Sequence, residues 1–397
     1  MNPQHIYFDN NATTPTDPRV VEAMLPYFYE QPGNAASRSH PFGWLADEAV
    51  DKARQQLASL IDVAPKEIIF TSGATESDNL ALKGVFEMYH RKGRHIITAK
   101  TEHKAVLDSC AHIEKMGGEV TYLEVDQNGL INLQQLDQAI RPDTVLVSVM
   151  WANNETGVIQ PLSEIGAICE KHGVILMSDA TQAVGKIPVH PKEAGVHLLA
   201  FSAHKMYGPK GVGALYVCNK QPRIKLTAQV DGGGHELGMR SGTLNVPGIV
   251  GFGRAAEIAA NELEQESQKL KHLRDKLESV LTTQLEEVYV NGKDAPRLAH
   301  VSNLSFRHVD AEPLLMGFNQ YIALATGSAC TSATLEPSHV LLAMGNSRDL
   351  AKSALRFSLG RFNNEAEVDR CVKAVIQGVE RLRAQSPIWE MFKEGII

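Results

Sequence analysis

The chain lacks several features that would assign it quickly to a class of protein. No apolar run among its 397 residues is long enough to cross a bilayer, and the N-terminal stretch MNPQHIYFDN has no basic segment followed by an apolar one. Its five cysteines are scattered, odd in number and without a CxxC pair, which excludes a disulfide framework or a zinc knuckle. No internal repeat or low-complexity segment is evident. We therefore expect a reduced, cytoplasmic protein.

An excess of positive charge is also missing. The formal net charge of −7 argues against a general binder of nucleic acid or of an anionic membrane. The hydrophobic content of 43% is ordinary and sufficient for a sizeable core. A length of 397 residues predicts two or three domains, or one large domain with a smaller one.

Strand-like and helix-like segments alternate over the middle of the chain, which predicts an α/β fold with a mostly parallel sheet and helices on both faces. A long amphipathic helix from Gly253 to about Gln284 then leads to a second, smaller α+β region. We expect a large domain over residues 14–260. Residues 1–13 and 261–397 would form the small domain, which carries a cysteine loop at about 325–337. The expected strands are 66–71, 95–98, 120–125, 145–150, 174–177, 198–201, 213–217, 288–290, 301–306 and 355–359, and the expected helices are 17–30, 44–60, 75–89, 105–115, 133–140, 161–171 and 365–383.

Polar side chains follow five of the expected strands. Ligands of such sheets sit outside the carboxyl ends of the strands, so these five exits should share one edge. A single polar exit is often only a helix cap or a turn, but five together favour a binding site. The exits are Ser72-Gly73, Glu102-His103, Asn153-Asn154, Ser178-Asp179 and Ser202-Ala203-His204-Lys205.

Lys205 is the first candidate for chemistry, because a partly desolvated lysine at a strand exit can form a Schiff base with a carbonyl. If that carbonyl belongs to pyridoxal phosphate, Ser202 and His204 are natural donors to the phosphate. Taken alone, Lys205 is better explained as a solvated lysine in a turn.

Three other exits would suit the same cofactor. Asp179 could keep a pyridinium nitrogen protonated, although it could also be a helix N-cap. Gln182 could reach a ring hydroxyl or be a surface amide, and His103 could stack on a ring, act as an acid or base, or be structural. The stretch from Ser72 to Thr75 could bind one phosphate through exposed N–H groups, or simply begin a helix with a Thr75-x-x-Asp78 cap; it lacks the P-loop and GxGxxG patterns.

Cys330 is the distinctive residue of the C-terminal part. The other cysteines lie where packing explains them, but Cys330 stands in a loop of small residues with little core to fill, so it is a candidate nucleophile. Arg356, on a following strand, could clamp a substrate carboxylate with two hydrogen bonds or form a surface ion pair.

Taken together, these segments resemble the cysteine desulfurases of the NifS and IscS type. These are pyridoxal-phosphate enzymes of the class-V aminotransferase family with the aspartate-aminotransferase fold (fold type I). The resemblance runs from about Tyr7 to Phe392. It is carried by 71–79 (TSGATESDN), 101–103 (TEH), 179–182 (DATQ), 202–205 (SAHK), 240–243 (RSGT), 327–332 (GSACTS), 335–338 (LEPS) and 356–362 (RFSLGRF).

The resemblance implies a role for each matching residue. Lys205 would carry pyridoxal 5′-phosphate and shuttle the substrate Cα proton, and Cys330 would attack the sulfur of L-cysteine and keep it as a persulfide while alanine leaves. Thr243 would reach the phosphate of the partner subunit, which implies an obligate homodimer. The remaining assignments are Asp179 to the pyridinium, Gln182 to the ring oxygen, His103 to the ring face, Ala74, Thr75, Ser202 and His204 to the phosphate, and Asn154 and Arg356 to the substrate carboxylate, with Asn154 also counted among the cofactor-binding residues.

The implied function is to supply sulfur for iron–sulfur cluster assembly and thiolation pathways. The acceptor would be an iron–sulfur scaffold protein or a tRNA-thiolation carrier, with no direct contact to nucleic acid or membrane. Whether Cys330 becomes a transient iron–sulfur ligand during handover stays open. The chain stops at Ile397, soon after Trp389-Glu390-Met391-Phe392, where scaffold-docking relatives usually continue, so the acceptor stays open too. The alternatives are an aminotransferase, a selenocysteine lyase, and a non-catalytic sulfur carrier that kept the fold.

Overall fold

The computed structural model describes residues 5–220, 222–326 and 336–396. Its largest sheet has the strand order β2-β8-β7-β6-β5-β3-β4. Of the strands described in this sheet, β8 alone runs antiparallel to its neighbours, which confirms the expected mostly parallel α/β fold. The strands are β2 (Ile68–Thr71), β3 (His95–Ala99), β4 (Glu119–Leu123), β5 (Thr144–Ser148), β6 (Ile175–Asp179), β7 (Leu198–Ser202) and β8 (Gly213–Val217).

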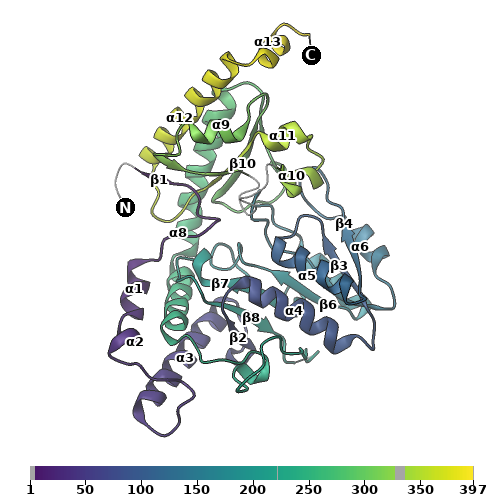
Figure 1. The fold of residues 1–397 in the computed structure, drawn as a ribbon, viewed down its shortest axis with the longest axis vertical. Coiled ribbons are helices and arrows are strands. Elements are labelled where there is room, and N and C mark those ends of the chain that lie inside the picture. Colours follow the sequence, from purple (N-terminus) through teal and green to yellow (C-terminus); the bar gives the residue numbers. More distant parts are fainter. Residues whose placement is uncertain (1–4, 221, 327–335, 397) are drawn as a thin grey trace.

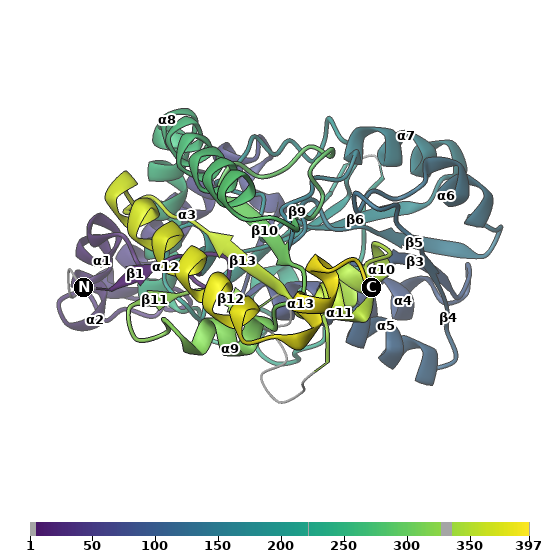
Figure 2. The same ribbon diagram turned by 90° about the horizontal axis from the view of Figure 1, so that it is seen from above.

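Helices cover both faces of this sheet, with α4 and α5 on one side and α7 on the other (Figure 2). Their apolar spacing explains the packing: in α3, residues Ala46, Ala49, Val50, Ala53 and Leu57 recur at helical intervals and are buried. The helices are α3 (Pro41–Leu60), α4 (Ala74–Tyr89), α5 (Lys104–Lys115), α6 (Leu133–Ala139) and α7 (Leu162–His172).

The C-terminal part forms a second layer above this sheet (Figure 1). Four antiparallel strands, in the order β12-β13-β10-β9, pack with helices around them. The strands are β9 (Val288–Val290), β10 (Val301–Phe306), β12 (Ala325–Thr326) and β13 (Ala354–Ser358), and the helices are α9 (Ala311–Met316), α10 (His339–Ala343), α11 (Arg348–Lys352), α12 (Glu365–Ala384) and α13 (Pro387–Lys393).

The helix α8 (Val246–Gln284) contributes to two separate hydrophobic cores. Its residues Ile249, Phe252 and Ala259 belong to the core of the large sheet. Leu270 and Leu277, further along α8, belong to the core of the C-terminal sheet. The division into domains near residue 260 stays a prediction, and this change of core within α8 supports it.

Several boundaries differ from the sequence expectations. The start of α4 carries no side-chain cap, because Gly73 precedes the helix and Thr75 and Asp78 lie within it, so the expected capping pattern is wrong. Asp78 is instead fully buried. The helix α8 begins at Val246 and not at Gly253, and Pro161 precedes α7 instead of lying in its first turn.

The N-terminal arm makes contacts that the sequence pattern did not predict. Its strand β1 (Ile6–Tyr7) pairs in parallel with β11 (Ile322–Ala323), more than 300 residues away. Two short helices follow the arm, α1 (Pro18–Met24) and α2 (Pro26–Tyr29). The arm therefore lies across the boundary between the two cores. No helix in the described residues has the length and apolar character needed to span a membrane.

Gly213 marks a close approach between β8 and the loop that precedes α4. A Cβ at this position would lie 2.6 Å from the Cα of Gly73 and 2.9 Å from the carbonyl oxygen of Phe201. We expect Gly213→Ala to lower the free energy of unfolding by about 1–3 kcal/mol through overpacking. The urea midpoint measures this change. Lys373→Ala, at an exposed position on α12, is the control; an equal loss in both variants would contradict the expectation.

Candidate active site

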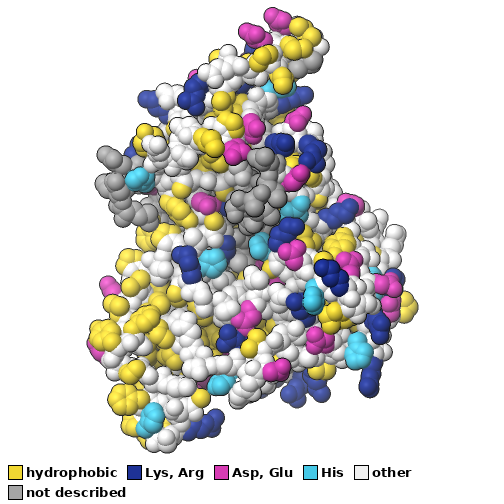
Figure 3. Space-filling model, in the orientation of Figure 1, with side chains coloured by type: hydrophobic (Ala, Val, Ile, Leu, Met, Phe, Trp, Pro, Cys, Tyr) yellow, Lys and Arg dark blue, Asp and Glu magenta, His cyan; other side chains and the backbone are white. Residues whose placement is uncertain are grey.

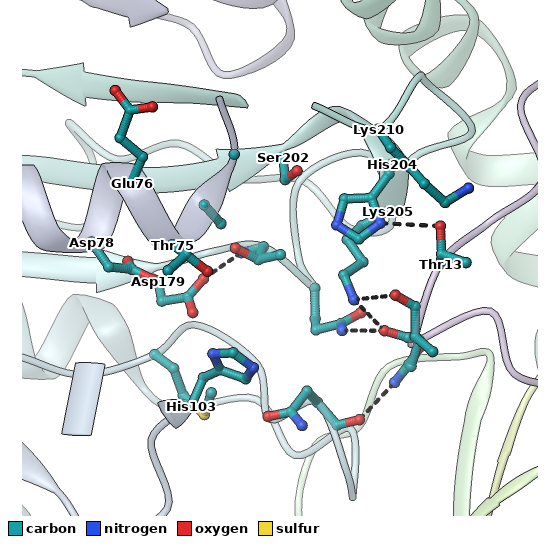
Figure 4. Close-up of a pocket in the computed structure, with 18 of the residues that line it drawn as sticks. Thr13, Thr75, Glu76, Asp78, His103, Asp179, Ser202, His204, Lys205 and Lys210 are labelled. Atoms are coloured by element: carbon teal, nitrogen blue, oxygen red, sulfur yellow. Dashed lines mark hydrogen bonds between the residues drawn. The ribbon is translucent and has the colours of Figure 1, made fainter. Parts of the chain in front are cut away.

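A cavity of about 560 Å³ lies at the carboxyl edge of the large sheet. Each of the five polar exits contributes at least one lining residue: Ser72, His103, Asn154, Asp179 and Ser202. Figure 4 shows the side chains of His103, Asp179 and Ser202 entering this region from different elements. The residues that sequence reasoning proposed and that the cavity brings together are Ala74, Thr75, His103, Asn154, Asp179, Gln182, Ser202, His204, Lys205 and Arg356.

Two proposed residues are placed differently. Thr243 is not among the residues that line this cavity. Cys330, together with the small-residue loop at 327–335, lies outside the described residues. Among the described residues, no group of three or more His, Cys, Asp and Glu side chains could hold a metal ion.

Lys205 ends a short turn of 3-10 helix that follows β7 directly. Its Nζ donates to the backbone oxygen of Asn11, and to that of Ala12 at 2.8 Å. The interpretation of Lys205 as a solvated turn lysine is therefore wrong, because its amine lies in the cavity and contacts the N-terminal arm (Figure 4).

Asp179 ends β6 and is only 5% exposed. Its Oδ1 accepts the backbone N–H of Thr181 at 2.9 Å, and its Oδ2 has no hydrogen-bond partner among the described residues. No helix begins there, so the helix-cap alternative is wrong. Gln182 is buried, and its Nε2 donates to the backbone oxygen of Asn11 at 3.0 Å, which excludes a surface amide.

Two further acids, Asp78 and Glu102, are fully buried near Asp179. Neither oxygen of Asp78 has a partner among the described residues, and Glu102 uses only Oε1, which accepts the N–H of Met150 at 2.7 Å. Burial, with the neighbouring charge of Asp179, raises the pKa of both well above its ordinary value. Burial thus opposes ionisation of both acids, whereas Asp179 has an oxygen available to face a cation.

The opposite side of the cavity suits an anion. The first N–H groups of α4 are without helical partners and belong to the stretch Ser72–Glu76, which lines the cavity. Burial, followed by the charges of Lys205 and Lys210, lowers the pKa of His204 to about 4, so its ring is neutral. Its Nδ1 lies 3.1 Å from Oγ1 of Thr13.

His103 is the N-cap of α5, where its Nδ1 accepts the backbone N–H of Ala105 at 3.1 Å. This bond means that Nδ1 carries no proton, and it sets the orientation of the ring at the cavity wall. The structural and functional interpretations of His103 are thus compatible, since the capping bond also aims the ring.

Arg356 is 2% exposed, so the interpretation as a surface ion pair is wrong. One terminal nitrogen donates to the backbone oxygen of Asn154 at 3.0 Å and the other to Oδ1 of Asp9 at 2.8 Å. Its Nε has no partner among the described residues. The arrangement presents a buried cation, held by two neighbours, to the cavity.

The site residues that sequence reasoning missed include three from the N-terminal arm. Asn11, Ala12 and Thr13 line the cavity, as does Lys210 beyond Lys205. The one sequence feature that marks this part of the arm is the polar run from Asp9 to Thr14, and such a run is typical of a surface turn. Nothing in its spacing indicates contact with residues almost 200 positions away.

These features define a class. The residues fit pyridoxal 5′-phosphate: an amine for the aldehyde in Lys205, an acid for the ring nitrogen in Asp179, and a helix start with Thr75 and Ser202 for the phosphate. The fit rests on the free Oδ2 of Asp179 and the orphaned oxygens of Asp78. The fold and the site thus define a pyridoxal-phosphate enzyme with a mostly parallel sheet.

Comparisons with known proteins agree with this class. The family model described as Aminotransferase class-V matches residues 6–371. The chain is 55% identical over 391 residues to a cysteine desulfurase IscS of Anaeromyxobacter sp. strain Fw109-5, covering 98% of this chain and 96% of the relative. A second cysteine desulfurase IscS, from Photorhabdus laumondii, is 53% identical over 393 residues, with the same coverage.

Solved structures show the same relation. A NifS-like protein matches with a TM-score of 0.87 and 39% identity, over 94% of this chain and 98% of its own. A NifS-like protein from Rickettsia africae matches with a TM-score of 0.85 and 29% identity, over 95% and 99%. The chain belongs to the class-V aminotransferase family and, within it, to the cysteine desulfurases. It is a pyridoxal-phosphate-dependent enzyme.

Glu155, next to the site, makes the free energy of unfolding of the protein depend on pH. It is buried next to Asn154, and its carboxyl accepts the hydroxyl of Ser338. Burial raises its pKa from 4.5 to about 7, against the lowering effects of Ser338 and Arg356. Between these two values the folded protein keeps a proton that the unfolded chain releases, so the free energy of unfolding falls as pH rises from 4.5 to 7.

We expect Glu155→Gln to remove this dependence. The quantity to compare is the melting temperature of the variant minus that of the parent, both free of cofactor and both measured by differential scanning calorimetry. This difference should be more positive at pH 8 than at pH 5. Glu380→Gln, at an exposed position on α12, is the control and should leave the difference constant. A constant difference for Glu155→Gln as well would show that Glu155 is ionised at both pH values.

Proposed function

We propose that the chain removes sulfur from L-cysteine, giving L-alanine and a persulfide on Cys330. The observation that carries the proposal is the cavity that places Lys205, Asp179, His103 and Arg356 at one edge of the sheet. The names of the relatives support it, since they are cysteine desulfurases over nearly the whole chain.

The bound cofactor supplies an electron sink that weakens bonds at the Cα of an amino acid. Around it, Asp179 stabilises a cation at the ring nitrogen, Gln182 binds the ring oxygen, and His103 packs on the ring face. The phosphate is held by Ala74, Thr75, Ser202 and His204. These assignments are the ones that the resemblance to cysteine desulfurases implies, and the fact that all seven residues line the cavity supports them.

The substrate end is formed by Asn154 and Arg356. The carboxylate of cysteine would bind the guanidinium of Arg356, whose other contacts, Asp9 and the oxygen of Asn154, fix its plane. Lys205 would move the proton at Cα. A lysine is an effective base only when its amine is held close to the reacting atom, and Lys205 lines the cavity in which the substrate would bind.

Sulfur transfer requires a thiol from outside the described residues. The thiolate of Cys330 would attack the substrate sulfur, so that an S–S bond forms, the Cβ–S bond breaks, and the carbon takes up a proton to become the methyl group of alanine. The cysteine thiol and the enzyme thiol are thereby converted to alanine and an enzyme persulfide, with no further oxidant.

The persulfide sulfur would pass to an acceptor, such as an iron–sulfur scaffold protein or a tRNA-thiolation carrier. Supply of sulfur for iron–sulfur clusters agrees with the IscS names of the relatives. A transient bond of Cys330 to an iron–sulfur cluster, a preference for selenocysteine and the cytoplasmic location stay predictions.

The nucleophile can be tested by substitution. We expect Cys330→Ala to keep the absorbance of the bound cofactor but to lose more than about 100-fold in alanine and sulfide release, because the attacking thiolate is gone. After incubation with L-cysteine, mass spectrometry should find one added sulfur atom on the parent peptide with Cys330 and none on the variant. Cys218→Ala, a buried position remote from the cavity, is the control. Sulfide release at the parent rate by Cys330→Ala would contradict the proposal. Formation of a new amino acid from a 2-oxo acid would indicate an aminotransferase instead.

We also propose that the enzyme is a homodimer. Large apolar side chains are exposed on the N-terminal helices, with Phe28 at 62%, Tyr29 at 68%, Phe42 at 54% and Trp44 at 57%. They gather where α1, α2 and α3 lie in Figure 1 and appear as the yellow area at the lower left of Figure 3. A second copy is the economical cover for this surface, and Thr243, away from its own cavity, would then reach the partner's phosphate.

The assembly is expected to have about twice the chain mass of 43.4 kDa in light scattering. Phe28→Glu combined with Trp44→Glu should shift it to a single chain, since two buried charges would oppose the association. Phe362→Glu, at an exposed position outside this surface, is the control and should stay dimeric. A monomeric parent protein would contradict the proposal.

A further inference from the structure

Asn11 lies in the N-terminal arm between β1 and α1, and it is only 2% exposed. Its backbone is engaged on both sides. The N–H donates to Oγ of Ser358 at 2.9 Å, and the carbonyl oxygen accepts from Nζ of Lys205 and from Nε2 of Gln182. The backbone of one residue thus connects β13, the candidate Schiff-base lysine and the candidate ligand of the ring oxygen.

The side chain of Asn11 reaches the substrate end of the cavity. Its Nδ2 donates to the backbone oxygen of Asn154 at 3.0 Å. The same oxygen accepts from Arg356 at 3.0 Å. Asn11 therefore contacts the lysine through its main chain and, through its amide, the backbone oxygen of Asn154 that also holds Arg356.

The orientation of this amide is set by His300. The ring is fully buried, and its Nε2 lies 2.9 Å from Oδ1 of Asn11. Burial lowers the pKa of His300 to about 3, so the ring is neutral. Because Nδ2 of Asn11 donates to Asn154, Oδ1 must accept, and the hydrogen of the imidazole lies on Nε2. A neutral histidine in this tautomer keeps the amide from rotating.

We propose that Asn11 is a positioning residue, which holds the Lys205 amine when it is not joined to the cofactor and keeps it in register with Asn154 and Arg356. The inference rests on the proposed function for the identity of the substrate. Its physical basis is preorganisation, because a lysine side chain has many rotamers and two fixed carbonyl acceptors, from Asn11 and Ala12, restrict them.

The chain offers a matched control in the preceding residue. Asn10 has the same side chain and is 5% exposed, and its Nδ2 donates to the backbone oxygen of Ser358 at 2.9 Å. It does not line the cavity. Asn10→Ala should therefore destabilise the arm without changing the contacts of Lys205 and Asn154.

The first measurement needs no bound cofactor. Acetylation of Lys205 with acetic anhydride in the cofactor-free enzyme, read by mass spectrometry, reports how firmly the amine is held. We expect Asn11→Ala to raise the acetylation rate about fivefold, because the variant loses the side-chain hydrogen bonds with Asn154 and His300 that fix the arm. Asn10→Ala should stay within about twofold of the parent. Equal rates in the parent and Asn11→Ala would overturn the proposal.

The second measurement is the kinetics of alanine formation from cysteine. We expect Asn11→Ala to lower kcat by about 10- to 100-fold, as for a misplaced catalytic group, while the dissociation constant of pyridoxal phosphate changes less than about threefold. His300→Gln, which can keep an N–H donor, should retain most of kcat, and His300→Leu should behave like Asn11→Ala. An equal loss of kcat in Asn10→Ala and Asn11→Ala would show a structural role only.

The two measurements separate the possible failures. If the parent enzyme forms no alanine from cysteine, the proposed function is wrong, but the acetylation rates still report on the position of Lys205. If the parent is active and Asn11→Ala is unchanged in both measurements, the proposed function stands and the role of Asn11 is excluded. Melting temperatures identify any variant that fails to fold.

Discussion

The strands β2, β3, β5, β6 and β7 run in the same direction, and this constraint decides where the chemistry lies. Parallel strands end at a common edge, and their outgoing loops carry unpaired backbone groups and polar side chains. The start of α4, Asp179 and Lys205, which are the proposed phosphate site, ring-nitrogen acid and cofactor-binding lysine, are thus brought together from three segments. The antiparallel strand β8 lies between β2 and β7. The strand β2 therefore runs in the same direction as β7 and ends at the same edge.

Buried charge is distributed unevenly in the cavity, and the distribution suits a zwitterionic cofactor. Asp78 and Glu102 have no cationic partner among the described residues, and burial raises the pKa of both well above its ordinary value. Asp179, whose Oδ2 has no hydrogen-bond partner among the described residues, is the acid proposed to face the ring. On the other side His204 is neutral, and the positive charges of Lys205 and Lys210 remain to attract a phosphate.

A second buried network joins the two cores close to the catalytic lysine. Arg361 pairs with Asp17 of the arm and with Glu266 of α8, both at 2.8 Å. Its backbone N–H donates to the hydroxyl of Tyr207 at 2.6 Å, and that hydroxyl donates to Glu266 at 2.9 Å. Tyr207 stands two residues after Lys205. A displacement of the C-terminal sheet would therefore also displace the backbone that carries the lysine. This coupling gives the arm and α8 a role in the geometry of the site as well as in the core.

The alternation of apolar strands and helices was enough to predict the parallel sheet, and the polar strand exits predicted most of the cavity, because both depend on local periodicity and on one rule of topology. The short elements β1, β11, α10 and α11 were not predictable, since pairings across 300 residues leave no local pattern. By itself the sequence determined which residue types are available: the lysine, the acids, the small-residue loop and the family motifs. Only the tertiary structure decided that Asn11 and Ala12 meet Lys205, that Arg356 is buried against Asp9, and that Asp78 lines the cavity with no hydrogen-bond partner in the described part of the chain. The reason is that burial and long-range hydrogen bonds arise only when distant segments pack together.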